Sequence, residues 1–294
     1  MTGIMVGFDG SKGAYQALAW AADEAGIQSC DLHVVQSWHE PAFGGPGAVA
    51  CYEIDALVQG AKDGLDATIR TVQEAHPDTS VYSTLADGPA AKAVLEHAED
   101  AGLVVVGARG AGGFLGLELG SVSSRVARRS PVPVVVVRGE HDRRSKDEVV
   151  VGVDGSLCGR RALAWAADWA RKHDKTLVAV LAWSYLEPQG IHGGEPMRSD
   201  YLASDATHVL STILAEVLGR SHGIRFIEET ACDLPARAIL ERAGDACLVV
   251  VGRHGTPHWA PPELGAVAQQ VLHHATCPVA VIPDGAGPHD RRGD

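Results

Sequence analysis

The chain has 294 residues, which is typical of about two domains. Hydrophobic residues make up 46% of it and charged residues 21%, so a packed core is possible and disorder of the whole chain is excluded. The formal net charge of −12 argues against a general nucleic-acid-binding protein, because contacts with phosphates need a basic surface.

Strands and helices alternate along the first half of the chain. We expect, in chain order, a strand at 3–8, a helix over 14–25, a strand at 32–37, a helix over about 53–75, a strand at 81–85, a helix over about 89–101, a strand at 103–106, a helix over about 122–129 that Ser121 can cap, and a strand at 134–137. The strands are short and apolar, as strands buried on both faces are. The pattern predicts an α/β fold with a doubly wound parallel sheet and helices on both of its faces.

The second half repeats the first at a fixed offset of 145 residues. The segments that return are VGFDGS as VGVDGS, ALAWAAD unchanged, and LVVVG unchanged. We therefore expect two homologous Rossmann-like domains, residues 1–140 and 147–284. A polar linker joins them, and residues 285–294 form a flexible tail.

Cysteine usage and the amino terminus indicate a cytoplasmic protein. The six cysteines have no C-x2-C spacing, which favours reduced thiols over a disulfide framework or a zinc site. The chain begins with a strand-like segment instead of a basic signal sequence. No apolar run approaches the roughly 18 residues of a membrane span, so we expect no membrane insertion.

A glycine-rich loop follows the fourth strand, from Gly107 to Ser121. It leaves the carboxyl end of a central strand, where doubly wound sheets bind ligands. It ends at a helix amino terminus, whose free N–H groups favour an anion. Glycines there allow a positive φ and a close approach of the backbone to a phosphate. The loop is neither G-x4-G-K-[ST] nor G-x-G-x2-G, and a plain flexible connector is an equally valid interpretation.

The spacing of the loop, Gly107-x2-Gly110-x9-Gly120-Ser121, resembles the ATP-binding pattern of the universal stress protein family. The opening VGFDGS and the closing GSVSSR and PVPVV segments are similar to that family too. The resemblance covers residues 2–138 and 147–283 and is closest to the tandem type found in actinobacteria. It implies a five-stranded parallel sheet in each half, with ATP at the ends of the strands.

The resemblance also implies roles for individual residues. Asp9 contacts the nucleoside, Val35 lines the adenine, and the phosphates are held by the motif residues Gly107, Gly110, Gly120 and Ser121. Ser123, in the following helix, belongs to the same candidate site, and Arg109 is placed to meet a phosphate. Simpler interpretations stay open: Asp9 forms a turn, Ser121 caps a helix, Val35 is core and Arg109 is solvated.

The second half keeps part of this pattern. The corresponding residues are Asp154, Val180, Gly252, Gly255 and Gly265. Ala266 stands where the first half has the serine, and Pro257, Pro261 and Pro262 remove N–H donors from the loop. Loss of one hydroxyl donor to a charged phosphate costs about 1.5–3 kcal/mol. We therefore expect a weak site, or none, in this half.

We expect an ATP-binding regulator of the stress response, with Mg²⁺ accompanying the triphosphate. The alternatives are a slow ATPase or autophosphorylating enzyme, and a structural stress protein without nucleotide. No Lys or evident base lies in the loop, so we assign no catalytic residue, and no His or Cys spacing indicates a metal site held by the protein. The resemblance also suggests that the two halves pair, and it leaves open whether the chain forms a homodimer. We further expect an unknown regulatory protein partner.

Overall fold

The computed structural model describes residues 3–38, 51–111, 119–139, 147–183, 199–219, 223–244, 246–255 and 263–285. The chain divides into two compact units, one reaching to Arg138 and the other running from Gly139 to Asp284. The three loop prolines of the second half and the expected tail beyond Gly285 lie outside the described residues.

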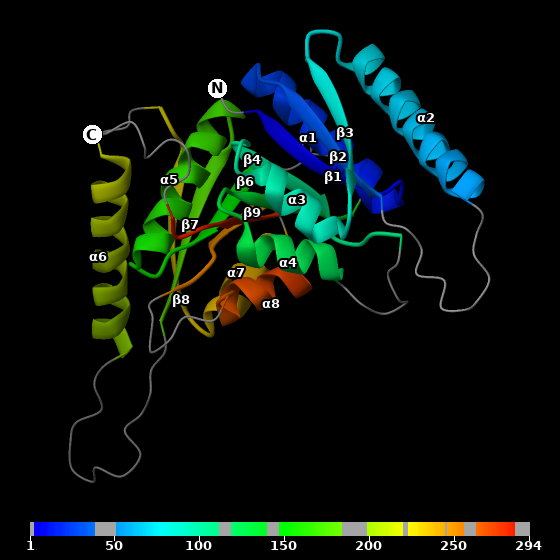
Figure 1. The fold of residues 1–294 in the computed structure, drawn as a ribbon. Coiled ribbons are helices and arrows are strands. Elements are labelled where there is room, and N and C mark those ends of the chain that lie inside the picture. The colour runs from blue at the N-terminus through cyan, green and yellow to red at the C-terminus, as the bar shows by residue number, and fades with distance from the viewer. Residues whose placement is uncertain are drawn as a thin grey trace, which may run out of the picture. The chain divides into compact units, whose positions relative to one another are not determined.

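The first unit is a five-stranded parallel sheet with helices on both faces, as predicted. Its elements are β1 (Ile4–Phe8), α1 (Lys12–Gln28), β2 (Leu32–Trp38), α2 (Cys51–Ala75), β3 (Val81–Asp87), α3 (Ala90–Ala98), β4 (Leu103–Gly107), α4 (Ser121–Arg129) and β5 (Val134–Val137). The strand order is β3-β2-β1-β4-β5. Helices α1 and α2 cover one face of this sheet, and α3 and α4 cover the other (Figure 1).

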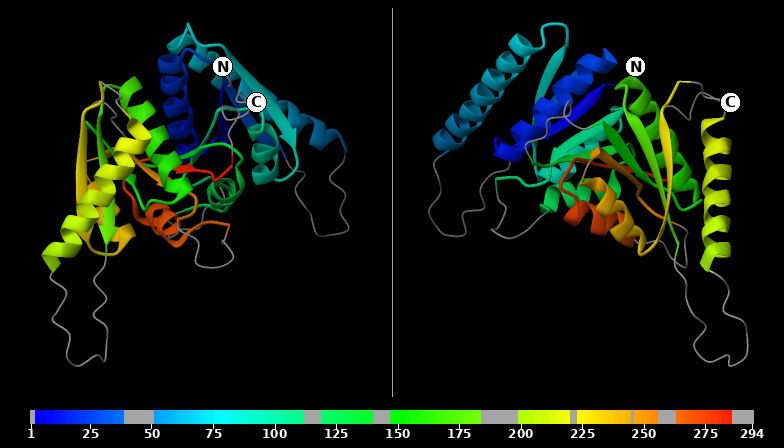
Figure 2. Two further views of the ribbon diagram at one scale, coloured as in Figure 1. Left: turned by 90° about the vertical axis from the view of Figure 1, so that its left-hand side faces the viewer. Right: turned by 180° about the vertical axis from the view of Figure 1, so that it is seen from behind.

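The second unit repeats the architecture. Its elements are β6 (Glu148–Gly152), α5 (Leu157–Lys172), β7 (Thr176–Trp183), α6 (Ser199–Leu218), β8 (Phe226–Cys232), α7 (Pro235–Ala243), β9 (Ala246–Gly252), α8 (Ala266–His274) and β10 (Val279–Ile282). The strand order, β8-β7-β6-β9-β10, is the counterpart of the order in the first unit. Figure 2 shows this unit from two further sides, with α5 and α6 packed together and α7 beside α8.

Burial explains why the central strands are so apolar. Val104 and Val105 of β4 and Val6 of β1 are each 0% exposed, because helices cover both faces of the sheet. Small residues such as Ala17 and Ala21 let α1 lie close to these strands, and both are also 0% exposed. The packed sheet therefore gives firm support to the loops at the carboxyl ends of its strands.

Helix α4 begins one residue earlier than predicted. Gly120 is its N-cap, with φ −78° and ψ 161°, and Ser121 is its first helical residue. The expectation that Ser121 caps this helix is therefore wrong. The N–H of Gly120 donates to the carbonyl of Ala108, which fixes where the helix starts. The hydroxyl of Ser121 is consequently not used as a cap.

The strand order places a switch point beside β1. After β1 the chain moves outward to β2 and β3, and then returns to the other side of β1 as β4. The connections that follow β1 and β4 therefore diverge onto opposite faces and leave a crevice at the carboxyl ends of these strands. Within the described ranges, no helix is both long and apolar enough to cross a membrane.

We predict that Leu163→Ala destabilises the protein by about 2–5 kcal/mol, because it leaves a cavity in the core. Leu163 of α5 is 0% exposed, whereas Leu157 of the same helix is 67% exposed. The matched change Leu157→Ala is expected to stay within about 0.5 kcal/mol of the unchanged protein. Urea unfolding monitored by circular dichroism measures both, and equal costs would contradict this account of the core.

Candidate functional site

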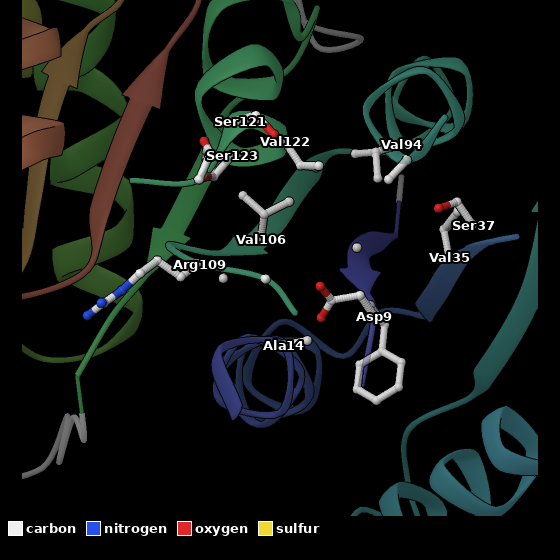
Figure 3. A pocket seen from close by; sticks show the side chains of 16 residues that line it. Asp9, Ala14, Val35, Ser37, Val94, Val106, Arg109, Ser121, Val122 and Ser123 are labelled. Atoms are coloured by element: carbon white, nitrogen blue, oxygen red, sulfur yellow. Dashed lines mark hydrogen bonds between the residues drawn. The ribbon is translucent and has the colours of Figure 1, made fainter. Parts of the chain in front are cut away.

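A cavity of about 360 Å³ lies at the carboxyl ends of β1, β2 and β4. This is within the usual range of about 300–1,000 Å³ for small-molecule sites. The amino-terminal parts of α1, α3 and α4 enclose it, through Ala14, Ala90 and Val94, and the first turn of α4 (Figure 3). Its polar side chains are few and convergent, and its walls are otherwise small or apolar. The described lining side chains that carry oxygen are those of Asp9, Ser37, Ser121 and Ser123.

Asp9 ties the glycine-rich loop to the end of β1. Its Oδ1 accepts a hydrogen bond from the N–H of Ser11 at 3.0 Å, and its Oδ2 accepts one from the N–H of Ala111 at 2.8 Å. The first bond forms the turn after β1, and the second holds the loop that follows β4. A carboxylate oxygen has capacity for a further donor, so the turn-forming role leaves room for contact with a ligand.

The motif glycines are required by close packing of the loop against α1. A Cβ on Gly107 would lie 2.6 Å from backbone atoms of Gly13, and a Cβ on Gly110 would lie 2.3 Å from Oδ2 of Asp9. On the α1 side of the same contact, a Cβ on Gly13 would lie 2.4 Å from the carbonyl oxygen of Arg109. The expected positive φ is not found at Gly107, Gly110 or Gly120. Absence of a side chain, and not a left-handed backbone, is what these positions need.

The two serines of α4 differ in availability. Ser123 is 2% exposed, and its hydroxyl lies 3.0 Å from the carbonyl oxygens of both Ala108 and Gly120. Its proton is therefore engaged in holding the loop to the helix. Ser121 is exposed in the first turn of α4 and faces the cavity. Of this pair, Ser121 is the better donor to a ligand.

Figure 3 shows the side chain of Arg109 directed away from Asp9 and from the serines of α4. Arg109 is among the residues that line the cavity, but its guanidinium group is directed away from the other labelled polar side chains (Figure 3). This direction favours the interpretation of Arg109 as a solvated side chain.

Several residues of the cavity lining were not predicted from the sequence. Val35 was expected there, but Ser37, Val94 and Val106 also line the cavity. Ser37 follows Val35 by two residues and therefore lies on the same face of the strand. This spacing alone would have predicted Ser37 as a lining residue. Val94 could not be placed, because its position depends on how α3 packs across β2.

The second unit carries different side chains at the equivalent positions. Every serine of the first cavity is replaced by alanine, at Ala182, Ala266 and Ala268. Val94 is replaced by Ile239, whose Cδ1 would lie 2.5 Å from a Cβ on Gly152. At the same place in the first unit, Cγ2 of Val94 would lie 3.1 Å from a Cβ on Gly7. The isoleucine thus extends further toward the end of its central strand.

The glycines of the second unit nevertheless retain their packing role. A Cβ on Gly255 would lie 2.6 Å from Oδ2 of Asp154. Gly110 makes the same close approach to Oδ2 of Asp9 in the first unit. Asp154 also accepts from the N–H of Ser156 at 3.0 Å and from its hydroxyl at 2.6 Å. The second unit therefore keeps the contact between the loop glycine and the aspartate, although it has lost the serine hydroxyl groups of the first cavity.

A charged cluster holds the described start of the second loop. Asp284 pairs with His254 and lies 3.6 Å from Nη2 of Arg253. Burial opposes ionisation of Asp284, but hydrogen bonds from Cys158 and His254 and the nearby positive charges hold its pKa below the usual range. Burial, together with the carboxylate of Asp284, raises the pKa of the Cys158 thiol to about 11. In the part of the chain that the structure describes, no three or more His, Cys, Asp or Glu side chains are grouped to hold a metal ion.

Comparison with known proteins defines the family. The sequence matches the universal stress protein family over residues 1–138 and again over 147–283. It is 32% identical to the universal stress protein Rv2623 of Mycobacterium tuberculosis over 289 residues, which cover 95% of each chain. It is 31% identical to Rv2005c of the same organism over 290 residues, covering 95% of this chain and 96% of that protein.

A solved structure shares the fold. The crystal structure of a universal stress protein from Archaeoglobus fulgidus matches 97% of this chain and 100% of its own, with a TM-score of 0.73 and 20% identity. The chain belongs to the universal stress protein family and carries two of its domains in tandem.

We predict that Gly110→Ala destabilises the protein by about 1–3 kcal/mol, because the new methyl group must displace Asp9 or the loop. Gly60 of α2 provides a matched control, since a Cβ there would meet no atom within 4 Å. Gly60→Ala is expected to be neutral or stabilising by up to about 1 kcal/mol. Chemical unfolding compares the two, and an equal effect of both changes would disprove the packing role of Gly110.

We also predict that Cys158 resists alkylation while Cys232 reacts. Cys232 is exposed, whereas Cys158 is 5% exposed and its pKa is raised to about 11. Because the thiolate is the nucleophile, Cys158 should react at pH 8 more than about a hundredfold more slowly than an ordinary exposed thiol. Iodoacetamide labelling followed by peptide mass spectrometry measures the rates, and both thiols should react in urea. Equal labelling rates for Cys158 and Cys232 in the native protein would contradict the burial of Cys158.

Proposed function

We propose that this protein is a nucleotide-binding regulator that holds ATP in the cavity of its first unit. The observation that carries the proposal is the meeting of the α4 amino terminus, the exposed Ser121 and the carboxylate of Asp9 around one cavity at the switch point of the sheet. Such crevices are where doubly wound sheets bind ligands. Family membership supports the same ligand class.

The cavity offers different surroundings to the parts of a nucleotide. The N–H groups in the first turn of α4 and the hydroxyl of Ser121 are donors for phosphate oxygens, and the positive end of the helix dipole favours their charge. Val35 and Val94 provide an apolar wall for the base. Asp9 lies between these regions, where a carboxylate accepts hydrogen bonds from ribose hydroxyls.

Mg²⁺ would be held chiefly by the nucleotide. The carboxylate of Asp9 already accepts two backbone N–H groups, and the other described oxygen-bearing side chains of the lining are serines. Mg²⁺ commonly keeps several water ligands and takes the rest from phosphates. The residues present fit this arrangement, in which the ion neutralises phosphate charge.

The lining favours binding over rapid turnover. Among the described residues around the cavity there is no lysine, and the guanidinium of Arg109 is directed elsewhere. Efficient phosphoryl transfer needs positive charge on the γ-phosphate and a group that orients the attacking water. We therefore propose that ATP acts by occupancy, changing contacts with a regulatory partner in the cytoplasm. Pairing of the two halves and dimerisation of the chain stay predictions.

The second unit is proposed to bind nucleotide weakly or not at all. It lacks all three hydroxyl groups, and Ile239 is bulkier than Val94. Each lost hydrogen bond to a phosphate costs about 1.5–3 kcal/mol, which is a factor of about ten to a hundred in affinity.

Titration calorimetry with ATP and Mg²⁺ tests the proposal on the full chain. We expect one site per chain. Ser121→Ala should weaken it about tenfold or more, through loss of a charge-assisted hydrogen bond. Val94→Ile, which installs the residue of the second unit, should weaken it further because the side chain enters the space for the base.

The second unit supplies matched controls for these variants. Ala266→Ser and Ile239→Val are the reverse substitutions and should leave the affinity of the first site unchanged. Two equally tight sites, or binding insensitive to both Ser121→Ala and Val94→Ile, would refute the assignment. Absence of binding by the unchanged protein would favour a stress protein without nucleotide. Release of phosphate at rates comparable to those of dedicated ATPases would favour the enzyme alternative.

A further inference from the structure

Two histidines meet between α3 and the sheet of the first unit. The ring centroids of His33 in β2 and His97 in α3 are 5.7 Å apart, and the rings are inclined by 68°. Nε2 of His33 lies 2.8 Å from Oγ1 of Thr84 in β3. Nδ1 of His97 donates to the carbonyl oxygen of Ala93 at 2.9 Å. The pair therefore links a cavity-lining helix to two strands.

The histidine pair lies directly behind the wall of the cavity. His33 precedes Val35 by two residues in β2, and His97 follows Val94 by three residues in α3. Val35 and Val94 both line the cavity. A change in the distance between α3 and β2 at the histidines must therefore alter the position of Val94 relative to Val35.

The second unit has a different contact at the same place. The residues equivalent to His33, His97 and Thr84 are Val178, Arg242 and Glu229. Nε of Arg242 lies 2.9 Å from Oε2 of Glu229, and its Nη2 lies 3.0 Å from Oε1 of Glu148 in β6. An arginine keeps its charge at any physiological pH. The helix-to-sheet contact is thus a permanent ion pair in one unit and a pair of titratable rings in the other.

We propose that the His33–His97 pair is a pH-sensitive latch that holds α3 against the sheet when both rings are neutral and releases it when the pair gains a proton. As a consequence, acidification loosens the nucleotide cavity of the first unit and leaves the second unit unaffected. The latch itself stands on the geometry of α3 and β2, and its effect on nucleotide rests on the proposed function.

The groups around the pair do not compensate an added positive charge, and the charged residues of α4, which packs against α3, are all arginines. In the described residues, the hydrogen-bond partners of the two rings are a hydroxyl and a carbonyl. Tyr82 is the register partner of His33 in β3 and is exposed, and β1 contains no titratable residue. On α3 itself, Lys92 and Glu96 pair with each other at 3.5 Å on the exposed side of the helix. Glu99 and Asp100, which follow α3, are both exposed.

The direction of the pH effect follows from burial. Burial of the ring, and next the charge of His97, lower the pKa of His33 from its usual value. A histidine whose pKa is lower in the packed state binds a proton more readily once α3 has separated from the sheet. The packed state is therefore fully stable above the unperturbed pKa of about 6.5 and loses stability as the pH falls below it.

Hydrogen–deuterium exchange of the ligand-free full chain tests the latch. Exchange of α3 (residues 90–98) and of its counterpart α7 (residues 235–243) is compared at pH 7.5 and pH 5.5, after correction for intrinsic rates. We expect protection of α3 to fall severalfold, and by about tenfold at most, at the lower pH while α7 changes little, because an unperturbed histidine is about ten times more often protonated than neutral at pH 5.5. Equal responses of α3 and α7 would overturn the inference.

Substitutions separate the histidine pair from a general acid effect. His33→Val installs the residue of the second unit and should make the protection of α3 independent of pH. His97→Gln keeps a donor for the carbonyl of Ala93 and should do the same. His208→Gln, at an exposed position in α6, is the matched control and should keep the pH response of the unchanged protein. A response that persists in both His33→Val and His97→Gln would disprove the latch.

ATP affinity at the two pH values gives the second readout. Since protonation of ATP itself affects every variant alike, the unchanged protein and His33→Val are compared at the same pH. We expect affinity to fall severalfold more in the unchanged protein between pH 7.5 and pH 5.5. A latch seen by exchange in a protein that binds no ATP at either pH would refute the proposed function alone. If ATP affinity depends on pH equally in the unchanged protein and in His33→Val, and the protection of α3 does not change with pH, the latch alone is refuted.

Discussion

The site depends on one close contact, that of the loop after β4 with the first turn of α1. Gly13 and Gly107 bring the two backbones together, and Asp9 joins them through the N–H groups of Ser11 and Ala111. A side chain at either glycine would push the loop outward. The loop held in this way also carries the carbonyl of Ala108, which accepts the N–H of Gly120 where α4 begins. The binding properties of the cavity follow from backbone packing before any ligand is considered.

The two units show that this frame and the side chains that line the cavity can vary independently. Both units keep the aspartate and the three motif glycines, and both bring a glycine of the loop against the aspartate, although Cys158 stands in the second unit where the first has Gly13. The side chains around the frame have diverged, since three serines are alanines in the second unit and Val94 is Ile239. Substitutions of this kind change a cavity's polarity and volume without disturbing the sheet. A single chain can therefore carry two different linings on the same backbone frame.

Most of the fold was predictable from the sequence because buried parallel strands and their helices have strong local patterns. The strands at 103–106 and 134–137 match β4 and β5 to within one residue, and the repeat predicted the second unit as a whole. The glycine spacing located the loop, but the reason for the glycines was packing instead of positive φ. The start of α4, the direction of Arg109 and the contact of His33 with His97 depend on packing between distant segments, which no local pattern encodes.

The need for Gly252 and Gly255 in the second unit has a consequence for the history of such proteins. A Cβ on either would collide with Cys158 or Asp154, so the packing of the loop requires these glycines whether or not a ligand binds there. A duplicated domain that loses its nucleotide therefore keeps the glycine signature of a binding site. The spacing of the glycines is therefore a sign of this loop packing and not by itself of a bound nucleotide.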